Sequence, residues 1–178
     1  YNITSQIVKT VDTPNPESDT AGQSAYAEYT YDAAGLLKTK KDSRGLLTAY
    51  TYDALNRISS ELSTVNGEPR TVSYAYDSRD NPVSVTDALG RATTFEYDKL
   101  DRAIRSTDYF GKTTSLEYNA MGQPISAADH YGRKITMAYD DAGRLVSRSF
   151  YARGGQAPFR TITYTYDAAG NVVSTQET

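Results

Sequence analysis

The chain has 178 residues, a formal net charge of −3 and a pI near 5.2, so it lacks the overall positive charge that would hold nucleic acid or an anionic membrane. It contains no cysteine, which excludes disulfides, thiolate zinc sites and a cysteine nucleophile, and no apolar run reaches the roughly 18 residues of a membrane helix. Its 16 Tyr, 4 Phe and no Trp indicate much amphipathic surface and little deep interior, because tyrosine lies half-buried on a sheet with its hydroxyl in water.

A Tyr-Asp pair recurs along the whole chain and predicts a repeat protein. From Tyr31 onward, the tyrosines of successive copies are 21, 24, 21, 21, 21 and 27 residues apart. Tyr1-Asn2 forms a further copy 30 residues before Tyr31. The longer steps coincide with Gly- and Pro-rich stretches, which predict loop insertions near residues 13–22, 66–69 and 153–158. The copies are Tyr31-Asp32, Tyr52-Asp53, Tyr76-Asp77, Tyr97-Asp98, Tyr118-Asn119, Tyr139-Asp140 and Tyr166-Asp167.

Asp-x-x-Gly signals predict chain reversals, after the Tyr of some copies and again about ten residues later. Asp caps its own turn, and the following left-handed position suits Gly, as in three-residue hairpin loops. Asn56, Asp80 and Asp101 replace Gly at three turns, and these residue types tolerate positive φ. The predicted turn pairs are Asp32 and Gly35, Asp42 and Gly45, Asp87 and Gly90, Asp108 and Gly111, Asp129 and Gly132, Asp140 and Gly143, and Asp167 and Gly170.

The segments between the turns have strand length and alternate with period two. The residue two before each Tyr is aromatic or aliphatic, whereas the intervening residues are mostly Thr, Ser, Ala and Glu. No segment shows sustained helical periodicity. The pattern therefore predicts an all-β protein of tandem antiparallel β-hairpins, which form one continuous meander. We expect strong curvature, because a sheet of about fourteen strands does not stay flat.

These motifs resemble the YD repeats of the RHS (rearrangement hotspot) family. The best windows are residues 86–98 (TDALGRATTFEYD) and 139–147 (YDDAGRLVS). The resemblance covers nearly all of residues 1–178 as one repeat segment, apart from 13–22 and the two tips. Because residues 171–175 correspond to a first strand without its partner, we expect a fragment of a longer array.

The resemblance implies a fold and a role. In RHS proteins, insecticidal toxin complex components and teneurins, such repeats spiral into a β-shell, which in bacterial members encloses a C-terminal toxin. The implied partners are the remaining repeats and the C-terminal toxin domain of the same parent chain, with secretion-system components or cell-surface glycans as further candidates. The implied location is outside the bacterial cell or at its surface. The family's autoproteolytic Asp-Pro junction has no counterpart here.

The sequence favours a scaffold without chemistry of its own, and we expect no enzyme activity, no cofactor and no metal site. His130 is the sole histidine, so histidine triads and clusters lack partners. Asp140 and Asp141 could form a carboxylate pair, but turn capping explains Asp140 better. Lone turn aspartates without the Gly-Gly-x-Gly-x-Asp pattern do not indicate calcium binding.

The alternative function is a surface or secreted adhesion module that binds carbohydrate or a partner cell. Tyr29, Tyr50 and Tyr74 could stack against sugar rings, although packing within the sheet explains such tyrosines more simply. A small basic patch is consistent with a solvated strand edge, and no helix follows Gly154-Gly155, so that pair is not a phosphate loop. The patch contains Lys38, Lys40, Lys41 and Arg44.

Overall fold

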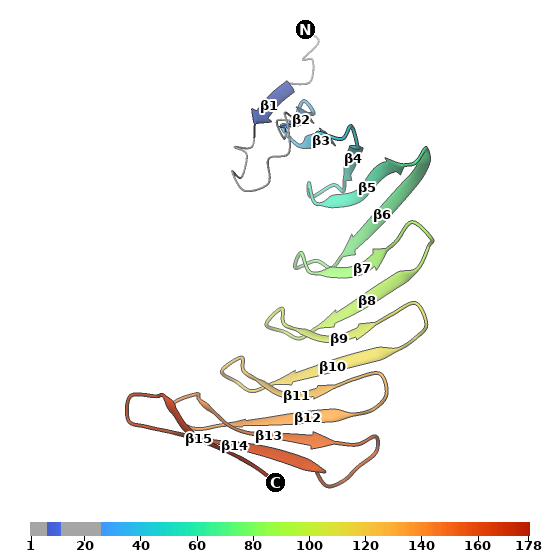
Figure 1. Ribbon diagram of the computed structural model, residues 1–178. Helices are drawn as coiled ribbons and strands as arrows, with labels where there is room; N and C mark the ends of the chain where they lie inside the picture. Colours follow the sequence, from blue (N-terminus) through green and yellow to red (C-terminus); the bar gives the residue numbers. More distant parts are fainter. Residues whose placement is uncertain (1–6, 12–25) are drawn as a thin grey trace. The chain divides into compact units, whose positions relative to one another are not determined.

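The computed structural model describes residues 7–11 and 26–178, and every regular element within these ranges is a β-strand (Figure 1). The chain forms two compact units, residues 1–92 and 93–178. The first unit holds β1 (Ile7–Val11), β2 (Tyr26–Tyr31), β3 (Leu37–Lys41), β4 (Leu47–Tyr52), β5 (Ile58–Val65), β6 (Glu68–Tyr76) and β7 (Pro82–Thr86). The second holds β8 (Ala92–Tyr97), which begins at the boundary, β9 (Ala103–Thr107), β10 (Thr113–Tyr118), β11 (Pro124–Ala128), β12 (Lys134–Tyr139), β13 (Leu145–Tyr151), β14 (Arg160–Tyr166) and β15 (Val172–Glu177).

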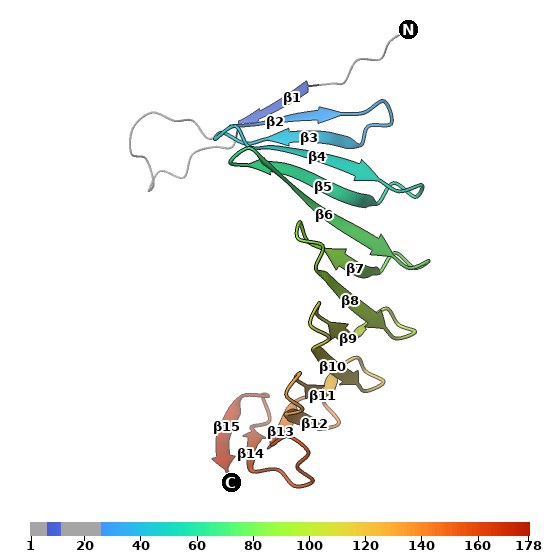
Figure 2. The ribbon, with the colours of Figure 1, turned by 90° about the vertical axis from the view of Figure 1, so that its right-hand side faces the viewer.

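Within each unit the strands pair antiparallel with their neighbours in chain order (Figure 2). From β2 onward, hairpins join neighbouring strands of each unit, because a short connection suits only adjacent antiparallel strands. The prediction of an all-β antiparallel hairpin meander is confirmed. No helix capable of crossing a membrane is found in the described ranges.

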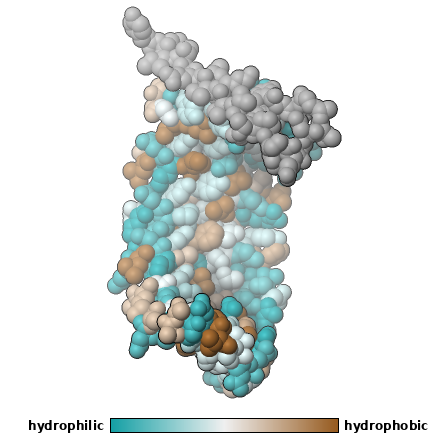
Figure 3. Space-filling view, turned by 60° about the vertical axis from the view of Figure 1, so that its left-hand side comes forward, coloured by the Kyte–Doolittle hydropathy of each residue, from teal (hydrophilic) through white to brown (hydrophobic). Residues whose placement is uncertain are grey.

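Several strands alternate between half-buried and exposed positions as they approach the motif tyrosine, which is itself half-buried. In β6, Val72, Tyr74 and Tyr76 are half-buried and the residues between them are exposed. No described side chain is fully buried, so strand-to-strand contacts replace a closed hydrophobic core. The surface in Figure 3 accordingly mixes apolar and polar side chains and shows no continuous apolar area.

The insertion at residues 66–69 lengthens two strands and does not form the predicted loop. Only Asn66 and Gly67 make the turn, with φ of 54° and 83°, whereas Glu68 and Pro69 already belong to β6. Two positive φ values in a two-residue turn match the twist of the flanking strands, so the ladder of β5 and β6 continues to Val65 and Glu68. Residues 153–158 lie in the β13–β14 connection, and residues 13–22 lie outside the described ranges.

Each Tyr-Asp hairpin also contains a β-bulge on the strand after its turn. In the β10–β11 hairpin Glu117 faces Ser126 and Tyr118 faces Pro124, which leaves Ile125 without a facing residue. The same register shift occurs one residue before the tyrosine in the hairpins of β2, β4, β6, β8, β12 and β14. Bulges of this kind increase local twist and change which face the next residues occupy.

Candidate functional site

Each Tyr-Asp turn is a three-residue loop closed by its own aspartate. In the β8–β9 hairpin the N–H of Asp98 donates to the carbonyl of Arg102 at 3.0 Å, and the N–H of Asp101 donates to the carbonyl of Asp98 at 3.2 Å. Oδ1 of Asp98 accepts the backbone N–H groups of Leu100 and Arg102 at 2.8 and 3.1 Å. One carboxylate thus satisfies two backbone donors that the loop leaves unpaired.

The predicted turn residues lie in loops of this type. Their glycines have φ between 75° and 87°, and Asn56, Asp80 and Asp101 take the same position with φ of 63°, 69° and 59°. Sequence reasoning missed Gly122, which has φ of 83° in the turn after Tyr118. The signal was present in the Tyr-Asn variant, because Asn119 Oδ1 accepts two backbone N–H groups as the aspartates do.

The turn aspartate also holds the residue four positions later. Nε of Arg102 donates to Oδ2 of Asp98 at 2.7 Å, and this bond is the main cause that lowers the pKa of Asp98, with the two backbone N–H groups adding to it. An arginine bond likewise lowers the pKa of Asp53, Asp87 and Asp129. For Asp77 and Asp167, a hydrogen bond from a side-chain amide is the main cause of the lowered pKa. For Asp42 and Asp140, the main cause of the lowered pKa is a hydrogen bond from a backbone N–H group.

These lowered pKa values predict acid sensitivity. A carboxyl group whose pKa is lower in the folded than in the unfolded chain stabilises the fold above the unfolded value of about 3.9, and this contribution is lost as pH falls through the folded pKa. We expect the melting temperature to stay nearly level from about pH 8 to pH 5 and to fall steadily below about pH 4. Thermal melts across this range test it, and an unchanged melting temperature at about pH 3 would contradict it.

Some of these arginines reach the next Tyr-Asp turn. Nη1 of Arg102 donates to the carbonyl of Asn119 at 3.0 Å, and its guanidinium lies over the ring of Tyr118 at 4.7 Å. Arg57 makes the same pair of contacts with Asp77 and Tyr76, at 2.9 and 4.6 Å. Arg144 donates to the carbonyl of Asp167, and its guanidinium lies over the ring of Tyr166. In the turn after Tyr118, the side-chain amide of Gln123 donates to the carbonyl of Gly143 at 2.7 Å. Cation–π contact and a charged hydrogen bond thus act between adjacent repeats.

The motif tyrosine completes the link in the opposite direction. Its hydroxyl donates to the carbonyl of the residue six positions after the preceding motif tyrosine. The bonds are Tyr52 to Leu37 at 2.7 Å, Tyr76 to Ile58 at 3.0 Å, Tyr118 to Ala103 at 3.1 Å, Tyr139 to Pro124 at 2.9 Å and Tyr166 to Leu145 at 2.7 Å. We call the tyrosine bond and the arginine contacts together the inter-repeat staple.

The staple lies where the backbone ladder stops. β11 and β12 pair from Ala128 and Lys134 to Ser126 and Thr136, and Pro124 lies beyond the end of this ladder. Beyond the end of the ladder, the carbonyl of Pro124 receives the side-chain hydroxyl of Tyr139 in place of a backbone N–H. The motif thus joins one hairpin to the next at the end that the ladder leaves open.

One strand offers a matched test of the tyrosine bond. Tyr166 and Tyr164 both lie in β14, but only the Tyr166 hydroxyl has a hydrogen-bond partner among the described residues. We expect Tyr166→Phe to lower the free energy of unfolding by about 1 kcal/mol, the usual net value of one hydrogen bond. Tyr164→Phe should change it by at most a few tenths of a kcal/mol. Denaturant titrations of both variants measure the difference, and equal values would refute the role of the Tyr166 hydroxyl.

The RHS Repeat family model matches residues 31–69, 76–108, 97–134 and 139–178, which is most of the chain. The chain belongs to the RHS repeat family. No curated protein matches it. Three similar solved structures are the TcdB2-TccC3-Cdc42 complex (19% identity, TM-score 0.73), the Photorhabdus luminescens Tc holotoxin pore with a TccC3 mutation (19%, 0.74) and TcdB2-TccC3 without its hypervariable C-terminal region (20%, 0.74). Each similarity covers 98% of this chain and 10% of the other, so the RHS segment spans about a tenth of those chains.

The three tyrosines predicted to stack ligands lie on the half-buried face of the first RHS unit, on β2, β4 and β6. Tyr29 faces Lys40 on β3, and Tyr50 faces Glu61 on β5, whose carboxylate accepts the Tyr74 hydroxyl at 3.3 Å. Burial raises the pKa of Tyr50 and of Tyr74, and the Glu61 charge adds to both. A hollow of about 170 Å³ includes Tyr50, Lys40 and Glu61 in its lining. The structure thus brings together tyrosines and charges of both signs.

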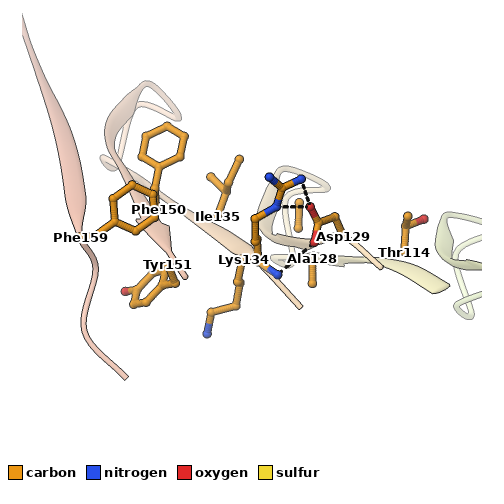
Figure 4. Close-up of a pocket in the computed structure, with 10 residues that line it drawn as sticks. Thr114, Ala128, Asp129, Lys134, Ile135, Phe150, Tyr151 and Phe159 are labelled. Atoms are coloured by element: carbon orange, nitrogen blue, oxygen red, sulfur yellow. Dashed lines mark hydrogen bonds and ion pairs between the residues drawn. The ribbon is translucent and has the colours of Figure 1, made fainter. Parts of the chain in front are cut away.

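The second RHS unit carries a larger and more apolar hollow, of about 400 Å³. Figure 4 shows Phe150, Tyr151 and Phe159 gathered at one end and Asp129 with Thr114 at the other. Phe159 comes from the β13–β14 connection, where its N–H donates to the Phe150 carbonyl at 2.9 Å. Sequence reasoning missed this hollow, because the strand period does not extend into the insertion. Arg133 holds the Asp129 carboxylate at 2.6 Å, so that carboxylate is already engaged.

The remaining candidates occupy ordinary positions in the repeats. The His130 ring lies beside that of Tyr131 in an exposed turn, with centroids 3.8 Å apart. Asp140 Oδ1 accepts the N–H groups of Ala142 and Arg144, as in the other turns, whereas Asp141 is exposed. The lysines of the basic patch are exposed on β3. No group of three or more potential metal ligands occurs in the described part of the chain.

Proposed function

We propose that this RHS segment is part of the wall of a β-shell that encloses a toxin or effector region in the C-terminal part of the same polypeptide. The inter-repeat staple is the observation that carries the proposal. It recurs at one end of the hairpins and joins neighbouring hairpins beyond the point where their backbone ladder ends. A thin sheet without a core gains from such links, since each repeat contacts only its neighbours.

The comparisons support the same role at the level of fold. The similar structures contain TccC3, and one of them is described as lacking a hypervariable C-terminal region. On this proposal a variable region of that kind is the cargo, and the repeats contribute containment and no catalysis. The turn carboxylates are consistent with a structural role, because they are occupied by backbone donors and arginines. Export from a bacterial cell, with a secretion system as a partner, follows from the same proposal.

Protease protection tests containment. In the polypeptide that carries this stretch together with its downstream region, we expect the downstream region to survive limited trypsin digestion about tenfold longer than the same region expressed alone. The combined substitutions Arg57→Ala, Arg102→Ala and Arg144→Ala should remove protection, because they break three staples. Arg44→Ala with Arg133→Ala is the matched control in the other set of turns. Equal digestion of the enclosed and isolated regions would contradict containment.

A second candidate is carbohydrate binding by the first unit. The hollow that joins Tyr50 with Lys40 and Glu61 favours it, because sugar sites combine a flat ring for stacking with charged hydrogen-bonding groups. On this hypothesis Tyr29, Tyr50 and Tyr74 carry the contact. A glycan array tests it: binding that disappears with Tyr50→Ala but persists with Tyr164→Ala would support the adhesion role. An array without signal would remove it.

A further inference from the structure

One row of side chains in the first unit places two hydroxyls between two cations. The registers set these residues directly opposite one another on the consecutive strands β3 to β6, at the usual strand spacing of about 4.8 Å. The hydroxyl residues in the middle are half-buried, whereas the cations at the two ends are exposed. We call this set the cation–hydroxyl row, and it consists of Lys40, Thr48, Ser63 and Arg70.

The groups of this row are not engaged by the described part of the chain. Lys40 lies over the Tyr29 ring at 6.0 Å and has no carboxylate partner there, and Arg70 makes no ion pair or hydrogen bond with a described residue. The hydroxyls of Thr48 and Ser63 have no hydrogen-bond partner among the described residues either. Aligned cations and hydroxyl donors of this kind suit an anion, because charge-assisted hydrogen bonds are roughly twice as strong as neutral ones.

Two hollows of the first unit meet along the cation–hydroxyl row. A hollow of about 170 Å³ includes the Lys40 end, and a groove of about 670 Å³ includes the Arg70 end. Both have Thr48 and Glu61 in their lining, so they adjoin. The groove is also lined by the lengthened start of β6 and by the turn at residues 87–91. Its volume lies in the range of small-molecule sites.

A facing pair beside the row supplies the other contacts that a sugar needs. Tyr50 lies two residues after Thr48 on the same face of β4, and Glu61 opposite it lies two residues before Ser63 on β5. A sugar ring stacked on Tyr50 would place an acidic substituent over the Thr48 and Ser63 hydroxyls. Glu61 would then accept a hydrogen bond from a ring hydroxyl.

We propose that the cation–hydroxyl row binds the anionic group of an acidic sugar, a carboxylate or a sulfate ester, while the sugar ring stacks on Tyr50. This inference rests on the carbohydrate-binding candidate and names its ligand class, and it does not depend on containment. Glu61 and Glu68 also line the groove and repel a densely charged polymer, so the ligand carries isolated anionic groups. A neutral sugar leaves both cations unused, which makes the charge the basis of selectivity.

Isothermal titration calorimetry on the full 178-residue chain tests the proposal with three tetrasaccharides. Chondroitin supplies carboxylates, keratan sulfate supplies sulfate esters without carboxylates, and carboxyl-reduced chondroitin is neutral. We expect an acidic probe to bind about tenfold more tightly than the neutral one, the value of one charge-assisted hydrogen bond. The acidic probe that does so identifies the anionic group.

Paired variants locate the anionic group. Lys40→Gln with Arg70→Gln should remove the preference for the acidic probe, and both positions are exposed, so the fold should persist. Lys99→Gln with Arg153→Gln makes the same change of charge at exposed positions of the second unit and should keep the preference. Tyr50→Ala should weaken all three probes, because it removes the stacking surface.

The outcomes separate this inference from the candidate on which it rests. Equal affinity of the acidic and neutral probes would overturn the inference and leave carbohydrate binding intact. A preference that survives Lys40→Gln with Arg70→Gln would overturn it by placing the anionic group elsewhere. Loss of the preference in the control pair would reduce the effect to net charge and would also overturn it. Absence of binding by all three probes would remove the inference together with the carbohydrate candidate.

Discussion

Gly111→Val should cause one of the largest losses of stability available to a single substitution at a turn. Gly111 closes the β9–β10 hairpin with φ of 77°, and a Cβ added there would meet no atom within 4 Å. The cost therefore comes from the backbone alone: a left-handed conformation costs an L-residue about 1–2 kcal/mol, and a β-branched side chain fits it worst. We expect the free energy of unfolding to fall by about 2 kcal/mol, and the melting temperature by about 4–8 °C.

The control substitutions separate conformation from side-chain loss. Gly111→Asn keeps a residue that tolerates positive φ and should cost less than half as much as Gly111→Val. Asn56→Gly, at φ of 63°, should add no backbone strain, because glycine adopts positive φ readily, so the free energy of unfolding should stay nearly unchanged. Thermal melts of the three variants measure this order. Equal melting temperatures would refute the assignment of these positions to left-handed turns.

Arg102→Ala should have an effect of similar size for a different reason. Its guanidinium holds Asp98, donates to the Asn119 carbonyl at 3.0 Å and covers the Tyr118 ring at 4.7 Å. The substitution removes an inter-repeat hydrogen bond from a charged donor and a cation–π contact, for which we expect a loss of about 2 kcal/mol. Urea titration of the variant measures it.

Arg133→Ala is the matched control, because this arginine makes the same fork with its turn aspartate. Nε of Arg133 donates to Oδ2 of Asp129 at 2.6 Å, but its side chain is 65% exposed and its aromatic contact is with Tyr131 of the same turn. An exposed ion pair contributes at most about 1 kcal/mol, and often nothing measurable. Equal losses in the free energy of unfolding would show that Arg102 stabilises only its own turn and that its contacts with the next repeat contribute nothing.

Much of the fold could be predicted because its signals are local. The Asp-x-x-Gly spacing predicts most of the chain reversals, and the apolar residue two before each tyrosine predicts the half-buried face. Position 116 shows the limit of this pattern: Leu116 is 37% exposed although it occupies that face of β10. In a sheet without a core, exposure at one position depends on the neighbouring strands, which the strand's own period does not describe.

The candidate site was predicted less completely. The turn aspartates were identified, but their hold on the residue four positions later was not, nor was the reach of Arg57, Arg102 and Arg144 to the next turn. The insertion at 66–69 was identified by its length and wrongly interpreted as a loop. Asn66-Gly67 is itself a two-residue hairpin signal, and applying that rule to the pair would have predicted the longer strands.

By itself, the sequence determined the repeat, the position of every described Tyr-Asp turn and the antiparallel order of the strands, because turn chemistry acts within five residues and neighbouring hairpins have little choice of partner. Only the tertiary structure decided how one repeat holds the next. The ladder of β11 and β12 ends at Ser126 and Thr136, and beyond it the hydroxyl of Tyr139 meets the carbonyl of Pro124, fifteen residues away. Such contacts depend on where two strands separate, and that is a property of the assembled sheet.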